Sequence, residues 1–296
     1  MKLSTCLAAS VLCFFFISAT RAQLPSGTGP VSIYALKNTG ELLWYKDLIQ
    51  NGTNGNCGER GWHSNSGRRI GDGLQDITQI ISEGNGILYA LKNTGDLLWL
   101  RDIWQNGKND PDAPLGWDAR SLEPIGCGWG FKQIVSGGNG IIYALKNTGE
   151  LLWYKDLYQN GKNGICGEHG WDPKSGNQIG CGWDFDHIFS GGNGVIYAIK
   201  STGELFWYKD VNRNGTNGKC GEHGWDQNSG KQVGCGWSGF KEFYTGSNGI
   251  IYALKSTGEL LWYRDMYRNG TNGKCGELGW NANSGKQIGC GWGDFR

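Results

Sequence analysis

This sequence has few long apolar runs and no large excess of charge of either sign. Apart from "LAASVLCFFFI" at residues 7–17, no stretch approaches the ~18 apolar residues needed to span a bilayer. Removing residues 1–22 takes away Lys2 and Arg21 and no acid, which leaves 26 basic residues (28 less these two) against 27 acidic ones. We therefore expect neither membrane insertion nor binding to nucleic acid by charge.

The first 22 residues predict an export signal. Lys2 supplies a positive n-region, the apolar run follows, and Thr20 to Ala22 place small residues before a cleavage site at Gln23. We expect a secreted, extracellular mature chain that forms a single domain over residues 23–296.

One segment of about 55 residues recurs five times along the mature chain. Its tyrosine, in the "IYALK"-type stretch, recurs at spacings of 55, 54, 54 and 55, at Tyr34, Tyr89, Tyr143, Tyr197 and Tyr252. Within the third unit, "FKQIVS", "IIYALK" and "ELLWYKDL" are typical of strands joined by Gly-rich turns, and "WDPKSGNQIGCGW" supplies a fourth. Four antiparallel strands per repeat indicate the blade of a propeller.

The "LLWY" run at residues 151–154 favours the same all-β fold. Strand alternation puts Leu151 and Trp153 on one face and Leu152 and Tyr154 on the other, so both faces need cover. Blades stacked between two neighbours meet that need. We predict a five-bladed β-propeller with four antiparallel strands per blade, in which the N- and C-terminal segments share a blade and close the ring.

Eight cysteines remain after residue 22, and six of them recur in register. Cys166 and Cys181, Cys220 and Cys235, and Cys275 and Cys290 are each 15 residues apart, which in an exported protein predicts a disulfide within each of these repeats. The first two units keep only Cys57 and Cys127, because Asp72 and Asp112 stand at the matching places. These two cysteines either pair with each other or join two chains, so the sequence leaves an oligomer open.

"GWDFDHIFSGGNGVIYAIKSTGELFWYKD" at residues 182–210 resembles the repeat of tachylectin-2-type lectins, five-bladed propellers of invertebrate innate immunity. The resemblance covers essentially the whole mature chain. It implies binding of N-acetylglucosamine- or N-acetylgalactosamine-type glycans at the blade junctions, on microbial or cell surfaces. The loop "NGKNGICGEHG" at residues 160–170 and its cysteine depart from the pattern of that family.

The tryptophans fall into three registers, of which the third suits a ligand best. The first register lies in the central strand, and the second follows the "CG" in four units with Leu74 in the remaining one; we expect both to pack between blades. The third follows a glycine beside the long loop, and a Trp ring there suits the apolar face of a pyranose. The resemblance carries a sugar-contact role onto this third set, which is Trp62, Trp117, Trp171, Trp225 and Trp280.

Polar partners for the sugar are expected beside these rings. The carboxylates that flank the third set are Glu59, Glu168, Glu222, Glu277, Asp172 and Asp226. The second unit lacks the glutamate, so its site is the most doubtful, and solvated loop residues are the alternative for all six. Three Asn-Gly-Thr sequons predict N-glycosylation at Asn51, Asn214 and Asn269.

Motifs of other chemistries are missing. The mature chain has no Cys-x-x-Cys, no adjacent cysteines and no Asp-x-Asp-x-Asp, so we expect no zinc, quinoprotein or calcium site and no cofactor. One catalytic centre needs residues that occur once, whereas nearly every polar feature here is repeated. We therefore expect no enzyme; the alternatives kept open are a propeller that binds protein partners and, less favoured, a quinoprotein or glycosidase.

Overall fold

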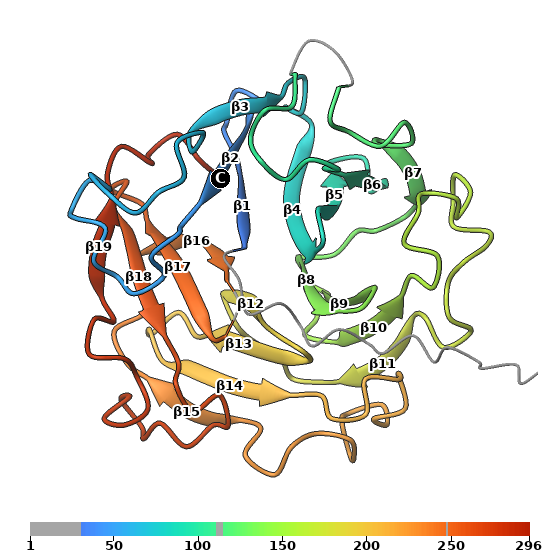
Figure 1. The fold of residues 1–296 in the computed structure, drawn as a ribbon. Coiled ribbons are helices and arrows are strands. Elements are labelled where there is room, and N and C mark those ends of the chain that lie inside the picture. Colours follow the sequence, from blue (N-terminus) through green and yellow to red (C-terminus); the bar gives the residue numbers. More distant parts are fainter. Residues whose placement is uncertain (1–30, 111–114, 247) are drawn as a thin grey trace, which may run out of the picture.

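The computed structural model describes residues 31–110, 115–246 and 248–296, and shows five antiparallel sheets arranged around a central axis (Figure 1). The first sheet holds β1 (Ser32–Leu36), β2 (Leu42–Lys46) and β3 (Arg68–Gly71). The second holds β4 (Ile77–Gly84), β5 (Ile87–Lys92), β6 (Leu97–Arg101) and β7 (Glu123–Gly126). The third holds β8 (Gln133–Gly138), β9 (Ile141–Leu145), β10 (Leu151–Lys155) and β11 (Asn177–Gly180).

The last two sheets repeat this pattern. The fourth holds β12 (His187–Gly192), β13 (Val195–Ile199), β14 (Leu205–Lys209) and β15 (Lys231–Gly234). The fifth holds β16 (Phe240–Thr245), β17 (Ile250–Lys255), β18 (Leu260–Arg264) and β19 (Lys286–Gly289). Strands follow sequence order from the axis outward, and the inner strands of successive sheets contact one another. The predicted five-bladed β-propeller is confirmed.

The turn between the two inner strands of a blade depends on glycine. In the third blade Gly140 has φ of 79°, and its carbonyl accepts a hydrogen bond of 2.8 Å from the Asp156 N–H. A Cβ at Gly140 would collide with the Asp156 carbonyl oxygen. Only glycine therefore lets the end of β10 lie against this turn.

The first blade is completed by a segment from the other end of the sequence. Beside β1, Lys37 forms an antiparallel bridge with Phe295, and the Arg296 N–H donates to the Leu36 carbonyl at 2.9 Å. The predicted sharing of a blade is confirmed for this C-terminal segment. Residues 23–30, which we expected to supply the rest, lie outside the described residues, as does the predicted signal at residues 1–22.

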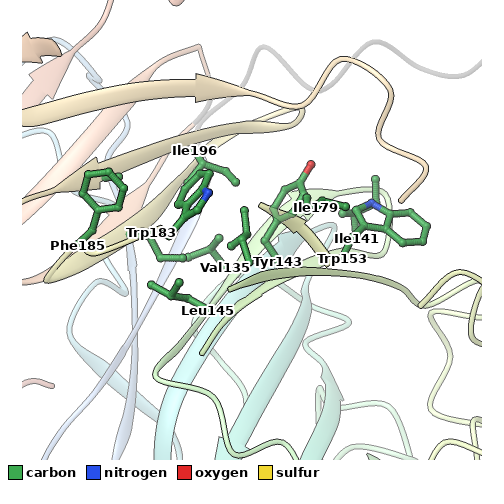
Figure 2. Packing of buried hydrophobic residues seen from close by; sticks show 12 residues of the cluster. Val135, Ile141, Tyr143, Leu145, Trp153, Ile179, Trp183, Phe185 and Ile196 are labelled. Carbon is green, nitrogen blue, oxygen red and sulfur yellow. The ribbon is translucent and has the colours of Figure 1, made fainter. Parts of the chain in front are cut away.

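The hydrophobic core is divided into five clusters that lie between adjacent blades. Val135, Tyr143 and Trp153 of the third blade pack with Trp183 and Ile196 of the fourth (Figure 2). The expected cover on both faces is found, since Leu151 and Trp153 are fully buried and Leu152 is 7% exposed. At about 25 cal/mol per Å² of apolar surface, stacking the blades is the main source of stability. Across the described ranges, no helix is long and apolar enough to cross a membrane.

All eight predicted cysteines form disulfides, but the predicted pairing within repeats is wrong. Cys166 is bonded to Cys127 rather than to Cys181, Cys220 to Cys181 rather than to Cys235, and Cys275 to Cys235 rather than to Cys290. Cys57 pairs with Cys290, so Cys57 and Cys127 neither pair with each other nor remain free to join two chains. In every case the Cα atoms are 4.6 Å apart.

The reason for the different pairing is the course of the loop after the third strand of each blade. This loop reaches back to the outer strand of the preceding blade, which brings its cysteine to the cysteine that follows that strand. The second cysteine of its own repeat lies beyond the next outer strand, at the following junction. Asp72, which takes the place of a cysteine after the outer strand of the first blade, lies at the junction between the first and second blades. Each of the eight cysteines among the described residues has a partner.

Candidate functional site

A buried aspartate fixes the start of each long loop. In the third blade, Oδ1 of Asp156 accepts hydrogen bonds from the N–H groups of Tyr158 and Gln159 at 3.0 and 2.9 Å, and from Asn163 Nδ2 at 3.0 Å. Its Oδ2 accepts from the hydroxyl of Tyr89 in the preceding blade at 3.0 Å. Burial and the neighbouring carboxylate raise the pKa of Tyr89 well above its usual range, so the hydroxyl stays a donor.

The same lock occurs in all five blades and joins each blade to the one before it. The five aspartates are fully buried, and each accepts from a tyrosine of the preceding blade; they are Asp47, Asp102, Asp156, Asp210 and Asp265. The loop therefore begins from one rigid geometry around the whole ring. The side chains of this loop are presented at five equivalent places around the ring.

The third-register tryptophans, predicted to contact sugar, lie half-buried between the outer strands of adjacent blades. Trp171 donates its Nε1–H to the Ile125 carbonyl of the preceding blade at 3.1 Å. Its ring centroid is 5.5 Å from that of Trp129, and the Tyr154 ring contacts both. The equivalent bonds of the other four are made by Trp62, Trp117, Trp225 and Trp280. These indoles are structural wedges that stay partly exposed to solvent.

The first and second tryptophan registers pack between blades, as expected. The first is fully buried, at Trp44, Trp99, Trp153, Trp207 and Trp262. The second is 6–7% exposed, at Trp129, Trp183, Trp237 and Trp292. Neither register offers a ring face to a ligand.

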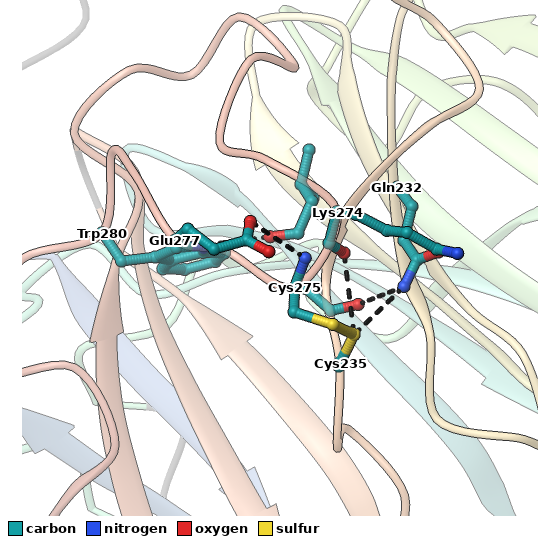
Figure 3. Close-up of a disulfide and its surroundings, with 8 residues drawn as sticks. Gln232, Cys235, Lys274, Cys275, Glu277 and Trp280 are labelled. Carbon is teal, nitrogen blue, oxygen red and sulfur yellow. Dashed lines mark hydrogen bonds between the residues drawn. A yellow bond between two sulfur atoms is a disulfide. The ribbon is translucent and has the colours of Figure 1, made fainter.

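The predicted glutamates lie in the same loop as the wedge tryptophan. The carboxylate of Glu277 accepts a hydrogen bond from the Cys275 N–H at 3.2 Å, beside the Cys235–Cys275 disulfide and Trp280 (Figure 3). The other glutamates make the same contact, with donor–acceptor distances of 3.1–3.4 Å, at Glu59, Glu168 and Glu222. All four side chains are exposed, so a carboxylate oxygen stays available to solvent.

The predicted aspartates follow the wedge tryptophan and cap a turn. Asp172 Oδ1 accepts from the Lys174 N–H, and Asp226 Oδ1 from the Asn228 N–H, both at 2.9 Å. Each is partly exposed. The fold thus brings glutamate, wedge tryptophan and aspartate into one loop at a blade junction.

The junction between the first and second blades differs from the other four. It has no disulfide among the described residues, Leu74 replaces the second-register tryptophan and Leu100 replaces the tyrosine that contacts both indoles elsewhere. Trp117 still donates to the Ile70 carbonyl at 2.9 Å. Four junctions therefore share one construction, and the fifth keeps only the wedge.

Sequence reasoning missed a second set of side chains at the same turns. Directly after each buried aspartate come two residues that are largely apolar and exposed, such as Leu157 at 49% and Tyr158 at 50%. The equivalent pairs are Leu48 and Ile49, Ile103 and Trp104, Val211 and Asn212, and Met266 and Tyr267. We interpreted this stretch as the end of the strand "LLWYKDL" and therefore did not expect exposed side chains there. The signal that could have revealed them is an apolar pair directly after the last residue of the strand.

A cavity of about 510 Å³ lies at the centre of the ring, bounded by the inner strands. Two of its titratable residues are not repeated: His187 and Glu242 stand at equivalent places where other blades carry Gln79 and Gln133. Burial lowers the pKa of His187 and raises that of Glu242 to about 7. Nowhere in the described ranges do three His, Cys, Asp or Glu side chains gather as for a metal ion.

Comparison with protein families identifies this architecture. The family model described as "Tachylectin" matches residues 35–296, from β1 to the last described residue. The chain belongs to the Tachylectin family. Its membership confirms the suspected resemblance and makes the molecule a propeller of a lectin family, a class that points away from catalysis. A comparison with curated proteins finds no match.

Three solved structures similar to this Tachylectin-family chain are distant from it in sequence. A yeast RCC1 (Prp20) bound to Kap60 has a TM-score of 0.38 and 11% identity, and the alignment covers 81% of this chain and 55% of that one. SapL1 lectin in complex with alpha methyl fucoside has a TM-score of 0.35 and 13% identity, covering 86% and 79%. YCF48 bound to D1 peptide has 0.33 and 15%, covering 87% and 63%. The chain thus spans little more than half of the RCC1 chain it matches, and these scores carry no argument about function.

Proposed function

We propose that this protein is a secreted, multivalent lectin that binds N-acetylglucosamine- or N-acetylgalactosamine-type glycans and acts in innate immune recognition or agglutination. The observation that carries the proposal is one loop construction, with an exposed carboxylate beside a wedge indole, repeated around a ring in a lectin family. Four disulfides are consistent with an oxidising, extracellular environment. Export with cleavage before Gln23 is part of the proposal.

The chemistry of each loop suits a sugar. The C–H face of a pyranose is apolar and packs on an aromatic ring, while carboxylates and amides accept and donate hydrogen bonds to hydroxyl and acetamide groups. In the third blade the partly exposed Trp171 and Asp172 and the second carboxylate oxygen of Glu168 supply these groups. Because the indole N–H already bonds to the preceding blade, the loop is held rigid before a ligand arrives.

Repetition is what makes weak sites useful. A shallow site that holds one sugar ring binds weakly, but several on one rigid ring gain avidity on a surface that displays many copies of the same glycan. The propeller spaces its loops evenly around the axis (Figure 1). We expect agglutination of cells that carry terminal N-acetylhexosamines.

Titration calorimetry of the secreted protein tests the proposal, with N-acetylglucosamine and N-acetylgalactosamine as ligands and glucose as the matched sugar without the acetamide. Binding of more than one equivalent of an N-acetylhexosamine, and weaker binding of glucose, would support the lectin. Four equivalents would point to the four blade junctions that carry a disulfide. If neither amino sugar gives heat with protein that unfolds cooperatively, N-acetylhexosamine binding is excluded. Another glycan or a protein partner would then be favoured.

A further inference from the structure

The second residue of each exposed pair lies against the backbone of a glycine. In the third blade the Tyr158 ring rests on Gly170, which directly precedes Trp171, and a Cβ at Gly170 would overlap Cδ2 of the ring. The same contact is made by Trp104 on Gly116 and Tyr267 on Gly279, where a Cβ would lie 2.7 and 2.6 Å from the ring. One side of each ring is thus covered by the chain, and 45–50% of each side chain stays exposed.

The fold does not require an aromatic ring at this place. In the first blade Ile49 covers Gly61, and in the fourth blade Asn212 covers Gly224, with the same loop around them. Because isoleucine and asparagine serve in the equivalent turns, the rings in the second, third and fifth blades are not needed for folding and are available for a ligand.

These rings are also rigidly held. The Tyr158 N–H is bonded to the buried Asp156 carboxylate, and the next residue, Gln159, has φ of 47°, a left-handed conformation that the same carboxylate stabilises. Gln105 and Arg268 have φ of 48° and 52° at the equivalent places. A ring fixed in this way loses little conformational freedom when a ligand stacks on it.

Each ring directly follows an exposed apolar residue in the sequence. Leu157 before Tyr158 is 49% exposed, Ile103 before Trp104 is 54% exposed and Met266 before Tyr267 is 51% exposed. The residue after each ring lies against the inner hairpin of its blade, Gln159 at Gly140 and Arg268 at Gly249. The open face of the ring itself fits the C–H face of a pyranose.

We propose that Trp104, Tyr158 and Tyr267 are the sugar-stacking residues, so that the second, third and fifth blades bind an N-acetylhexosamine and the first and fourth do not. This inference rests on the proposed lectin function and names its site. It predicts three equivalents of bound sugar per chain, whereas binding at the four disulfide-bonded junctions would give four. The wedge tryptophan directly follows the glycine on which the ring rests and then acts as a positioning residue.

A sugar fits this face better than a lipid surface or a second copy of the chain. The sequon asparagines Asn51, Asn214 and Asn269 each come two residues after the ring position, in the first, fourth and fifth blades, and their side chains are exposed. The same turns are followed by polar loops that carry lysine and glutamate. We expect a face with this polarity to stay hydrated. Each exposed apolar side chain would then contact a ligand on its own, and not as part of a continuous apolar patch.

Equilibrium dialysis with labelled N-acetylglucosamine, on enzymatically deglycosylated protein, counts bound sugar at saturation. Three equivalents are expected, falling to two in each of Trp104→Ala, Tyr158→Ala and Tyr267→Ala and to none in the triple variant. Ile49→Ala is the matched control in an equivalent turn and should leave three. The variants Ile49→Tyr and Asn212→Tyr should each add one equivalent, which is a gain that misfolding does not produce.

The outcomes separate the two proposals. If the wild type binds N-acetylglucosamine but the triple variant retains all of it, the lectin function stands and this inference is overturned. If the wild type binds neither amino sugar, both fail. Cosedimentation with phosphatidylcholine–phosphatidylserine vesicles and sedimentation velocity complete the test, because ring-dependent vesicle binding or self-association in place of sugar binding would also overturn the assignment.

Discussion

Cys57 in the first blade is bonded to Cys290 in the fifth, 233 residues further along the chain. The other three disulfides join blades that the backbone already connects, with separations of 39 or 40 residues. The Cys57–Cys290 bond is therefore the covalent link that closes the ring. Trp62 supports the same junction, because its indole N–H donates to the Ile288 carbonyl at 3.3 Å.

Loss of this bond should destabilise the protein more than loss of any other disulfide. In the chain-entropy account, a loop of 233 residues contributes about 5.5 kcal/mol and one of 39 residues about 3.9 kcal/mol. We expect Cys57→Ala with Cys290→Ala to lower the unfolding free energy by about 1.6 kcal/mol more than Cys181→Ala with Cys220→Ala. Urea unfolding of both double variants measures the difference, and an equal or reversed order would contradict the ring-closing role.

Peptide mapping without reduction should find only bonds between neighbouring blades. We expect peptides that join Cys127 to Cys166 and Cys181 to Cys220, because the loop of each blade lies on the blade before it. A peptide that joins Cys166 to Cys181 would show that the loops fold within their own repeats. The reduced and alkylated protein is the control.

The buried aspartate lock should be among the most sensitive positions. Asp156→Ala leaves the Tyr89 hydroxyl, two backbone N–H groups and Asn163 Nδ2 without this acceptor, which we expect to cost about 3 kcal/mol or more. Tyr89→Phe removes one hydrogen bond to a charged group and should cost about 2 kcal/mol. Thermal unfolding measures both, at about 2–4 °C per kcal/mol for a protein of this size. Equal shifts in the two variants would argue against the multiple bonds to Asp156.

Stability should fall as pH rises from about 5 to 7, in part because of Glu83. Its carboxylate is buried, accepts from Ser136 Oγ and the Gly140 N–H, and lies near Arg213 and Asp156; burial raises its pKa to about 7. Because this pKa exceeds the ordinary 4.5, the folded state holds the proton more tightly than the unfolded state. The contribution is complete below about pH 4.5 and is lost as pH rises through 7.

The variant Glu83→Gln isolates this contribution. Glutamine keeps both hydrogen-bonding positions but does not titrate, so the fall in Tm between pH 5 and 8 should become smaller by several degrees. Glu150→Gln, at an exposed hairpin, is the control and should leave the pH profile unchanged. A profile of Glu83→Gln identical to that of the wild type would show that Glu83 is not the titrating group.

The three sequons should carry glycans when the protein is secreted by a eukaryotic cell. In each, the Thr hydroxyl donates to the Asn Oδ1 at 2.6 Å and the asparagine is exposed, which leaves Nδ2 accessible. Intact-mass analysis before and after enzymatic deglycosylation should show up to three glycans, at Asn51, Asn214 and Asn269. Asn160, in the same turn but followed by Gly-Lys, should stay unmodified.

Much of the fold followed from the sequence, whereas the details of the site did not. The apolar character of both faces at Leu151–Tyr154 predicts stacked blades, and the tyrosine spacing predicts their number. The sequence predicted the third-register tryptophans beside the long loop, but their half-buried, hydrogen-bonded state depends on the outer strand of the neighbouring blade. The exposure of Tyr158 could not be predicted, because an apolar residue after a strand has the same sequence pattern whether it is buried or exposed.

The sequence by itself determined the repeating unit, because strand alternation, turn glycines and the recurring cysteine positions are properties that one repeat carries alone. Tertiary structure decided which repeat each loop touches. Cys166 meets Cys127 and not Cys181 because the loop that carries it lies back over the preceding blade, and that direction depends on how two blades stack. Exposure of Trp104, Tyr158 and Tyr267 was decided in the same way, since only the packed ring shows which apolar side chains find no neighbour to cover them.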